Sequence, residues 1–181
     1  MTTLQLIQMT LRKLDRPTDN DTVALYRERL TGYLNEAIMD LTVELRPWRR
    51  DTVTVTRGKA ELSTLPLACH KVLAARIDGK RRLFYYGSTR NTLLFPGMEN
   101  GTAEITYRYL PALLQELTDE PALSEPLQEL LVEYAAARER SRFDAASQNV
   151  AKLDLTLYRE MRGRLKRGCS ALDLGEIYNI Y

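Results

Sequence analysis

The sequence predicts an α+β fold: an elongated helical bundle, made of two N-terminal and two C-terminal helices, with an inserted antiparallel β subdomain. Three observations support this prediction. Apolar residues recur at helical spacing towards both ends of the chain, polar and apolar residues alternate in the middle, and two tight-turn dipeptides interrupt that middle region. We therefore expect the bundle to comprise residues 1–50 and 111–168, and the β subdomain residues 51–110.

The two N-terminal helices are predicted over residues 2–14 and 22–45, separated by a polar loop in which Pro17 prevents helix continuation. The first carries an apolar stripe of Leu4, Ile7, Leu11 and Leu14. The second would be about 36 Å long. Its stripe consists of Val23, Tyr26, Leu30, Leu34, Ala37, Leu41 and Leu45. Gly32 lies inside this helix, and we expect close helix packing there to compensate for a cost of roughly 1 kcal/mol relative to alanine.

The middle of the chain has the period of β-strands. Residues 52–56 alternate strictly and are β-branched throughout. Asp78-Gly79 and Asn100-Gly101 are residue pairs that favour two-residue hairpin turns. Residues 102–110 place Ala103, Ile105, Tyr107 and Tyr109 on one face. These patterns predict an antiparallel sheet of five or six short strands.

The helical period returns after Pro111. Residues 112–117 are predicted as a short helix or turn, followed by a connector containing Pro121 and Pro126. Helices are then expected over residues 125–142 and from about residue 147 to Gly168, joined by a tight turn with Asp144 or Ser147 as cap. The last helix carries an apolar stripe of Val150, Leu153, Leu157, Met161 and Leu165.

Residues 169–181 have no clear helical period and are unusually apolar for a terminus. We expect them to form a docking arm, because exposed aromatic and branched side chains gain nothing in water. The alternative is that the arm folds back on its own bundle. Its candidate anchors for a partner protein or a neighbouring subunit are Leu172, Leu174, Ile177, Tyr178, Ile180 and Tyr181.

Charge is sorted along the C-terminal half, although the whole chain has a net charge of only +2. Residues 112–134 contain six acids and no base, whereas residues 138–167 contain nine bases and four acids. Three interpretations stay open: solvated faces paired within the chain, a head-to-tail interface between identical subunits, or a nucleic-acid patch. The interface interpretation involves acidic Glu125, Glu129 and Glu133 and basic Arg138, Arg142, Arg159 and Arg162.

The residue inventory offers little for catalysis or metal binding. The one histidine, His70, is adjacent to Cys69. Neighbouring side chains point apart on a strand, so Cys69 is poorly placed to be a nucleophile with His70 as its general base. No phosphate-binding, zinc or dinucleotide motif is present, and no apolar run is long enough to cross a bilayer. We therefore expect no enzyme activity, no cofactor, no metal and no membrane partner.

Several short segments, in order, resemble the head-to-tail adaptor (connector) proteins of tailed bacteriophages. The resemblance covers about residues 3–166, and its order and spacing carry it. The segments are Tyr33-Leu-Asn-Glu-Ala37, Leu62-Ser-Thr-Leu-Pro66, Ile77-Asp-Gly79, Ile105-Thr-Tyr-Arg-Tyr-Leu-Pro111, Asp119-Glu-Pro121 and Leu130-Leu-Val-Glu-Tyr-Ala-Ala136. Ser124-Glu-Pro126 departs from the family pattern, and the tail has no counterpart.

The resemblance implies a structural virion protein made in the host cytoplasm and located at the neck, between capsid portal and tail. Such proteins form a homo-oligomeric ring, commonly of twelve subunits, that binds the portal protein and the tail or stopper proteins. Genomic DNA passes through the lumen without sequence-specific binding. The alternative is a small nucleic-acid-binding or regulatory α+β module that uses the basic C-terminal helix.

Overall fold

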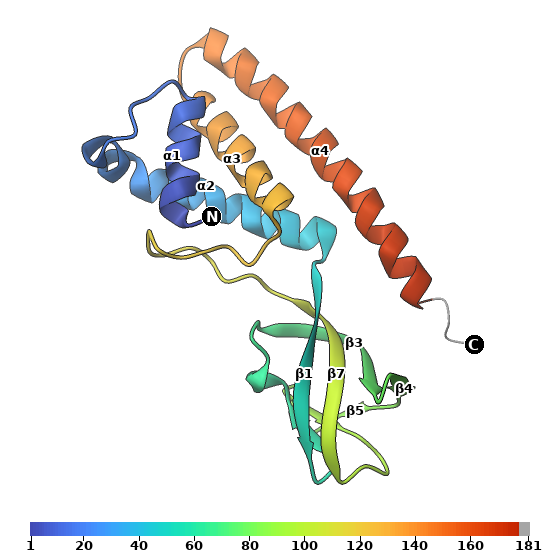
Figure 1. Ribbon diagram of the computed structural model, residues 1–181. Coiled ribbons are helices and arrows are strands. Elements are labelled where there is room, and N and C mark those ends of the chain that lie inside the picture. Colours follow the sequence, from blue (N-terminus) through green and yellow to red (C-terminus); the bar gives the residue numbers. More distant parts are fainter. Residues whose placement is uncertain (178–181) are drawn as a thin grey trace. The chain divides into compact units, whose positions relative to one another are not determined.

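The computed structural model describes the backbone of residues 1–177 and the side chains of residues 1–166. The chain divides into two compact units (Figure 1). A helical unit comprises residues 1–45 and 112–181, and a β unit comprises residues 46–111. Helices from the two ends of the chain therefore pack together, and the strands lie between them in sequence, which makes the fold α+β.

The described part of the helical unit contains four helices, α1 (Thr3–Lys13), α2 (Asn20–Leu45), α3 (Glu125–Arg140) and α4 (Ala145–Ile177). A capping box begins α1, where Thr2 accepts a hydrogen bond from the Gln5 amide and the Gln5 side chain accepts one from the Thr2 amide. The predicted apolar stripes of α1 and α2 supply much of the core. Its buried residues are Leu6, Ile7, Leu11, Val23, Leu30, Leu34, Ala37, Ile38, Leu41, Leu45, Leu114, Leu123, Leu130, Leu131, Val132, Ala135 and Tyr158. A Cβ built on Gly32 would meet nothing within 4 Å, so the close packing predicted at this glycine does not occur within the chain.

One prediction about the last helix needs correction. It does not end at Gly168 but continues to Ile177, since glycine in a long helix costs only about 1 kcal/mol and breaks no hydrogen bond. The docking-arm residues 178–181, and the side chains of 167–177, lie outside the described residues. The predicted turn before α4 is confirmed: the Asp144 carboxylate accepts a hydrogen bond of 2.9 Å from the Ser147 amide.

The segment between the last strand and α3 contains no helix. Of the short helix or turn predicted at residues 112–117, only a turn is present at its end, where the Asp119 amide donates to the Glu116 carbonyl at 3.1 Å. The Asn35 side chain on α2 instead holds this segment. Its oxygen accepts from the Leu114 amide at 2.8 Å, and its nitrogen donates to the Leu114 carbonyl at 2.9 Å. This pair of bonds replaces the hydrogen bonds that a helix would have made within the segment.

The β unit contains one antiparallel sheet of seven strands in the order β4-β3-β7-β1-β2-β6-β5. The sequence predicted five or six strands. Long strands β1 (Trp48–Thr56), β3 (Cys69–Ile77) and β7 (Asn100–Tyr109) form its centre. The short strands are β2 (Lys59–Glu61), β4 (Lys80–Arg82), β5 (Tyr85–Tyr86) and β6 (Thr92–Leu94). As predicted, Ala103, Ile105 and Tyr107 lie buried on one face of β7.

Of the two predicted hairpin turns, Asp78-Gly79 is confirmed and Asn100-Gly101 is wrong. Asn100 and Gly101 are instead the first two residues of β7, where they pair with Thr56 and Val55 of β1. Asp78 and Gly79 join β3 to β4 with φ values of 51° and 73°, the positive angles of a type I′ hairpin turn. Gly58 follows β1 with φ 71°, and a Cβ there would lie 2.8 Å from the Met98 carbonyl oxygen. Glycine is therefore needed at this position, because other residues rarely adopt this positive φ and because a side chain would collide with the Met98 carbonyl.

Candidate assembly surfaces

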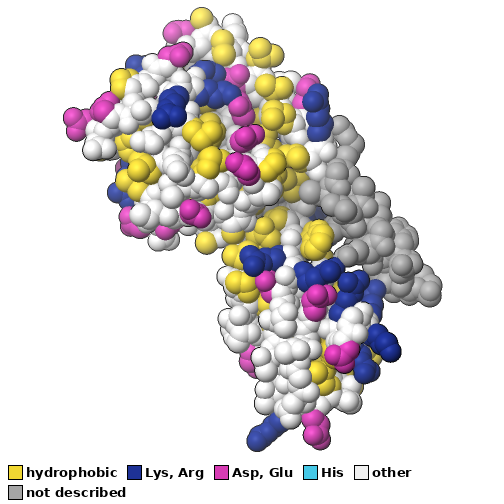
Figure 2. All heavy atoms as spheres, in the orientation of Figure 1, with side chains coloured by type: hydrophobic (Ala, Val, Ile, Leu, Met, Phe, Trp, Pro, Cys, Tyr) yellow, Lys and Arg dark blue, Asp and Glu magenta, His cyan; other side chains and the backbone are white. Residues whose placement is uncertain are grey.

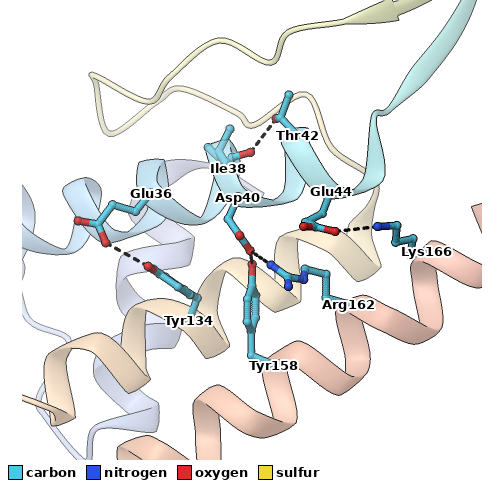
Figure 3. Close-up of polar contacts among 9 residues, drawn as sticks. All are labelled: Glu36, Ile38, Asp40, Thr42, Glu44, Tyr134, Tyr158, Arg162 and Lys166. Atoms are coloured by element: carbon cyan, nitrogen blue, oxygen red, sulfur yellow. Dashed lines mark hydrogen bonds and ion pairs between the residues drawn. The ribbon is translucent and has the colours of Figure 1, made fainter.

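A layer of polar contacts joins α2 to α4 (Figure 3). The Tyr158 hydroxyl donates to the Asp40 carboxylate at 2.6 Å, and the Arg162 guanidinium pairs with the same oxygen. One turn along α2, Glu44 pairs with Lys166 at 2.8 Å, and Lys166 lowers the pKa of that carboxyl. Burial and the Asp40 carboxylate both raise the pKa of the Tyr158 phenol above its ordinary value, which keeps it protonated as a donor.

α3 is fixed to α2 by a buried ion pair that the sequence pattern does not reveal. Glu139 is 2% exposed, and both of its oxygens accept from Arg29, each at 2.9 Å. A carboxylate on an otherwise apolar helix face is the only signal the sequence offers for such a pair. The bidentate geometry orients α3 against α2 and completes the hydrogen bonding of a charge removed from water.

The predicted acidic interface residues divide into two groups. Glu125 and Glu129 are exposed and make no ion pair with another described residue. Glu133 pairs instead with Lys13 on α1. The acidic edge that stays available to another molecule is therefore the first turn and a half of α3.

Most of the predicted basic interface residues pair within the helical unit. Arg138 lies 3.3 Å from Glu36, Arg142 lies 3.9 Å from Glu139, and Arg162 pairs with Asp40. Arg159 is exposed and makes no ion pair with another described residue. The structure thus does not bring the acidic and basic segments together; each segment pairs mainly with α1 or α2.

The first three residues of the apolar stripe predicted for the last helix lie at the surface, which corrects the prediction that this part of the stripe faces the bundle. Leu153 is 70% exposed, Val150 46% and Leu157 47%, whereas Tyr158 is 2% exposed. Ala151 and Tyr158 face the core instead, and Met161 and Leu165 pack at its margin. α4 docks through a face whose polar groups are satisfied by Asp40 and Arg140, so its most apolar stripe faces outwards.

Cys69 and His70 do not form a catalytic pair. Both lie on β3, at a register irregularity between Cys69 and Lys71, and no hydrogen bond joins these two described side chains. Burial raises the pKa of the Cys69 thiol, which disfavours the nucleophilic thiolate. Among the described residues, no group of three or more His, Cys, Asp or Glu side chains could hold a metal ion. The helices described here are all too short or too polar to span a membrane.

Comparison with known proteins adds family information to this geometry. No curated protein sequence is significantly similar to the chain. A chain from a solved structure described as the neck of an empty GTA particle computed with C6 symmetry is 17% identical, with 77% of this chain and 79% of that chain covered, at a TM-score of 0.33. That score is too low to carry an argument.

The family model of the SU10 adaptor protein matches residues 1–173, nearly the whole chain and both units. This match confirms the resemblance to head-to-tail adaptors on which the sequence prediction depends. The chain belongs to the SU10 adaptor protein family.

Proposed function

We propose that this protein is a structural component of a tailed-phage-like virion, located at the neck. There it forms a ring, of twelve subunits in the family pattern, that joins the portal to the tail and extends the DNA channel. Membership of the SU10 adaptor protein family is the observation that carries this proposal. The portal protein and the tail or stopper proteins are its partners, and DNA passes through the lumen without sequence-specific contacts.

The chemistry of this role is binding alone. A ring subunit must hold its surfaces in fixed geometry under load, and the buried Arg29–Glu139 pair and the Asp40 contacts to α4 supply that rigidity within the helical unit. The basic residues of α3 and α4 are mostly paired with carboxylates of the same chain. This pairing favours the adaptor role over a nucleic-acid-binding module that would use the same bases.

Subunits of the ring meet through unlike surfaces. Glu125 and Glu129 on α3, and Arg159 on α4, are the predicted interface residues whose charges are left without an ion pair to a described residue. Exposed pairs contribute only about 0–1 kcal/mol each, so charge sets the orientation of neighbours while apolar packing supplies the affinity.

The docking arm at residues 169–181 reaches the portal or an adjacent subunit. Its apolar anchors, named above, would each contribute roughly 1.5–3 kcal/mol on burial. Deleting residues 169–181 tests the arm: we expect unchanged stability of the isolated subunit and loss of portal attachment. A large fall in melting temperature with attachment retained would show that the arm belongs to the bundle.

Native mass spectrometry tests the adaptor role as a whole. The purified 20.8-kDa chain is measured alone and after mixing with the portal protein encoded alongside it. We expect a closed ring or a portal-bound ring with a mass near twelve subunits. A chain that stays monomeric with the portal and is missing from purified particles would overturn the proposal.

A further inference from the structure

The two units carry net charges of opposite sign, which the value of +2 for the whole chain conceals. Residues 46–111, the β unit, contain twelve Lys and Arg and five Asp and Glu, which gives this unit a net charge of +7. The rest of the chain has fourteen bases and nineteen acids. Figure 2 shows Lys and Arg side chains close together on the β unit. A charge of this size suits an anionic partner.

The strand register places five of these bases on one face of the sheet. On β1, β3, β4 and β7, residues opposite each other on neighbouring strands share a face, and outer positions alternate with buried ones. Glu104 on β7 is opposite Arg76 on β3, and Arg76 is opposite Arg81 on β4. We call the bases at outer positions of these four strands the basic face: Arg50, Lys71, Arg76, Arg81 and Arg108.

One acid, Glu104, lies among these bases. Its carboxylate is 3.5 Å from Arg50 and 4.0 Å from Arg76, so two guanidinium groups share a single negative charge. No ion pair to a described residue is made by the other three bases of the face, Lys71, Arg81 and Arg108. The face therefore has a net charge of +4 that the chain leaves uncompensated.

The other four acids of the β unit lie off this face. Asp51 is at a core-side position of β1, where it accepts a hydrogen bond from Tyr107. Glu61 is on β2, two residues from Lys59, which has the opposite charge. Asp78 lies in the turn between β3 and β4, and Glu99 directly precedes β7. The acids of the unit therefore do not neutralise the basic face.

Two pairs of like charges are set directly opposite each other on the basic face. Lys71 is opposite Arg108, and Arg76 is opposite Arg81. Like charges in this position destabilise a sheet. The Nε of Arg108 is also buried without a hydrogen-bond partner, which costs further stability. The fold gains nothing from this arrangement, whereas a bound anion would offset both costs.

We propose that the basic face binds the phosphate backbone of duplex DNA without reading its sequence. The choice of DNA rests on the proposed function, in which DNA passes along the ring. The two like-charge pairs are four residues apart along β7, about 13 Å, so they can meet separate phosphates. Exposed hydroxyls at outer positions supply further donors for phosphate oxygens, from Thr52, Thr54 and Thr102.

The composition of the face favours a duplex over a protein or a single strand. Protein interfaces depend on apolar anchors near their centre. None of the exposed large apolar side chains described in the β unit lies on β1, β3, β4 or β7. A single strand requires exposed aromatic rings on which its bases stack. Trp48, at an outer position of β1, is partly buried. A duplex needs only cations and hydroxyl groups, which this face has.

Fluorescence anisotropy with a labelled duplex of random sequence, about 30 base pairs long, tests the proposal. The full chain is titrated at salt concentrations between about 50 and 200 mM. The Lys71→Glu, Arg81→Glu variant should bind at least about tenfold more weakly. Its slope of log affinity against log salt should be smaller by about two, one for each lost phosphate contact. Its melting temperature should not fall, because both residues are exposed and unpaired and Arg81→Glu removes the repulsion from Arg76.

The Arg57→Glu, Arg90→Glu variant is the matched control. It makes the same change in net charge within the β unit, at two exposed positions in loops outside the four strands. It should bind DNA within about threefold of the unchanged chain, because the screened field of distant charges is weak. Equal losses of affinity in the two variants would mean that net charge determines binding, and would overturn the proposal.

Two further results would contradict the proposal. The unchanged chain might show no binding to the duplex even at the lowest salt, or the Lys71→Glu, Arg81→Glu variant could bind DNA normally but no longer assemble with the portal. The second result would mean that the basic face meets an acidic protein surface. Neither affects the adaptor role, which depends on the mass of the assembled species. Failure of the unmodified chain to assemble overturns that role even where DNA binding is retained.

Discussion

Tyr158 on α4 donates a hydrogen bond of 2.6 Å to Asp40 on α2, at a point where the phenol is buried and the carboxylate also pairs with Arg162 (Figure 3). The aromatic ring of Tyr158 contributes to the apolar core, and its hydroxyl and the two charged groups satisfy one another at the margin. One tyrosine thus fixes the rotation of α4 about its axis. That rotation is what places Val150, Leu153 and Leu157 at the surface.

Replacing Asp40 by alanine should destabilise the helical unit by about 2–3 kcal/mol, because the Tyr158 hydroxyl and Arg162 both lose their acceptor. The free energy of unfolding from a denaturant titration measures this loss. Glu44→Ala is the matched control, since it removes the exposed partner of Lys166 on the same helix. The control should change stability little. Equal losses from both variants would contradict a special role for Asp40.

Stability should fall as the pH rises above about 10, the ordinary pKa of a tyrosine. The pKa of Tyr158 is raised in the folded chain, so above pH 10 the unfolded chain has lost this proton while the folded chain still holds it. The unfolded state then binds fewer protons, and the free energy of unfolding decreases with pH. Unfolding titrations between pH 8 and about 11 should show this decrease.

Tyr158→Phe supplies the comparison for that pH dependence. The variant lacks the phenol, so its free energy of unfolding should be lower at pH 8 and should decline less steeply above pH 10 than that of the unchanged chain. Tyr107 has a raised pKa in the β unit, through burial and its hydrogen bond to Asp51, and accounts for part of the remaining slope. Parallel slopes in the two proteins would rule out Tyr158 as a source of the effect.

Most of the elements that the sequence predicted correctly have local signals, although the local signal at Asn100-Gly101 predicted a turn where β7 begins. The apolar stripe of α2, the Asp78-Gly79 turn and the Asp144 cap each depend on residues within a few positions of one another. The α+β architecture followed from the change of hydrophobic period at both ends of the middle region. Asn35 is different: its hydrogen bonds to Leu114 span 79 residues and have no local signature, so the sequence could not decide between a short helix and a turn at residues 112–117.

The face of α4 that packs on the core could not be predicted, because it is not the most apolar face of the helix. Val150, Leu153 and Leu157 form the more apolar stripe, yet the helix docks through Tyr158, Arg162 and Asp154. The partners that make this polar face favourable, Asp40 and Arg140, lie on two other helices. Glu133 and Arg138 show the same limit: their partners, Lys13 and Glu36, are more than 90 residues away in sequence.

Arg29→Met should destabilise the helical unit by roughly 3 kcal/mol, because it leaves the Glu139 carboxylate buried without its bidentate partner. Arg27→Met is the control two residues away. Arg27 pairs with Glu116 at the surface, where the loss should be about 0–1 kcal/mol. Thermal or denaturant unfolding of the two variants measures the difference. Similar losses would mean that the Arg29 pair contributes no more than a surface pair does.

The acidic edge of α3 permits charge and folding to be tested separately. Reversing Glu125 and Glu129 to lysine should leave the melting temperature nearly unchanged, since neither pairs with a described residue, and should impair ring assembly if unlike charged surfaces orient the subunits. Glu133→Lys should behave in the opposite sense. It would set two lysines against each other at Lys13 and lower the melting temperature before any effect on assembly. Light scattering of the assembled species, together with melting curves of the subunits, separates the two effects. Normal assembly of the Glu125→Lys, Glu129→Lys variant would exclude this edge from the interface.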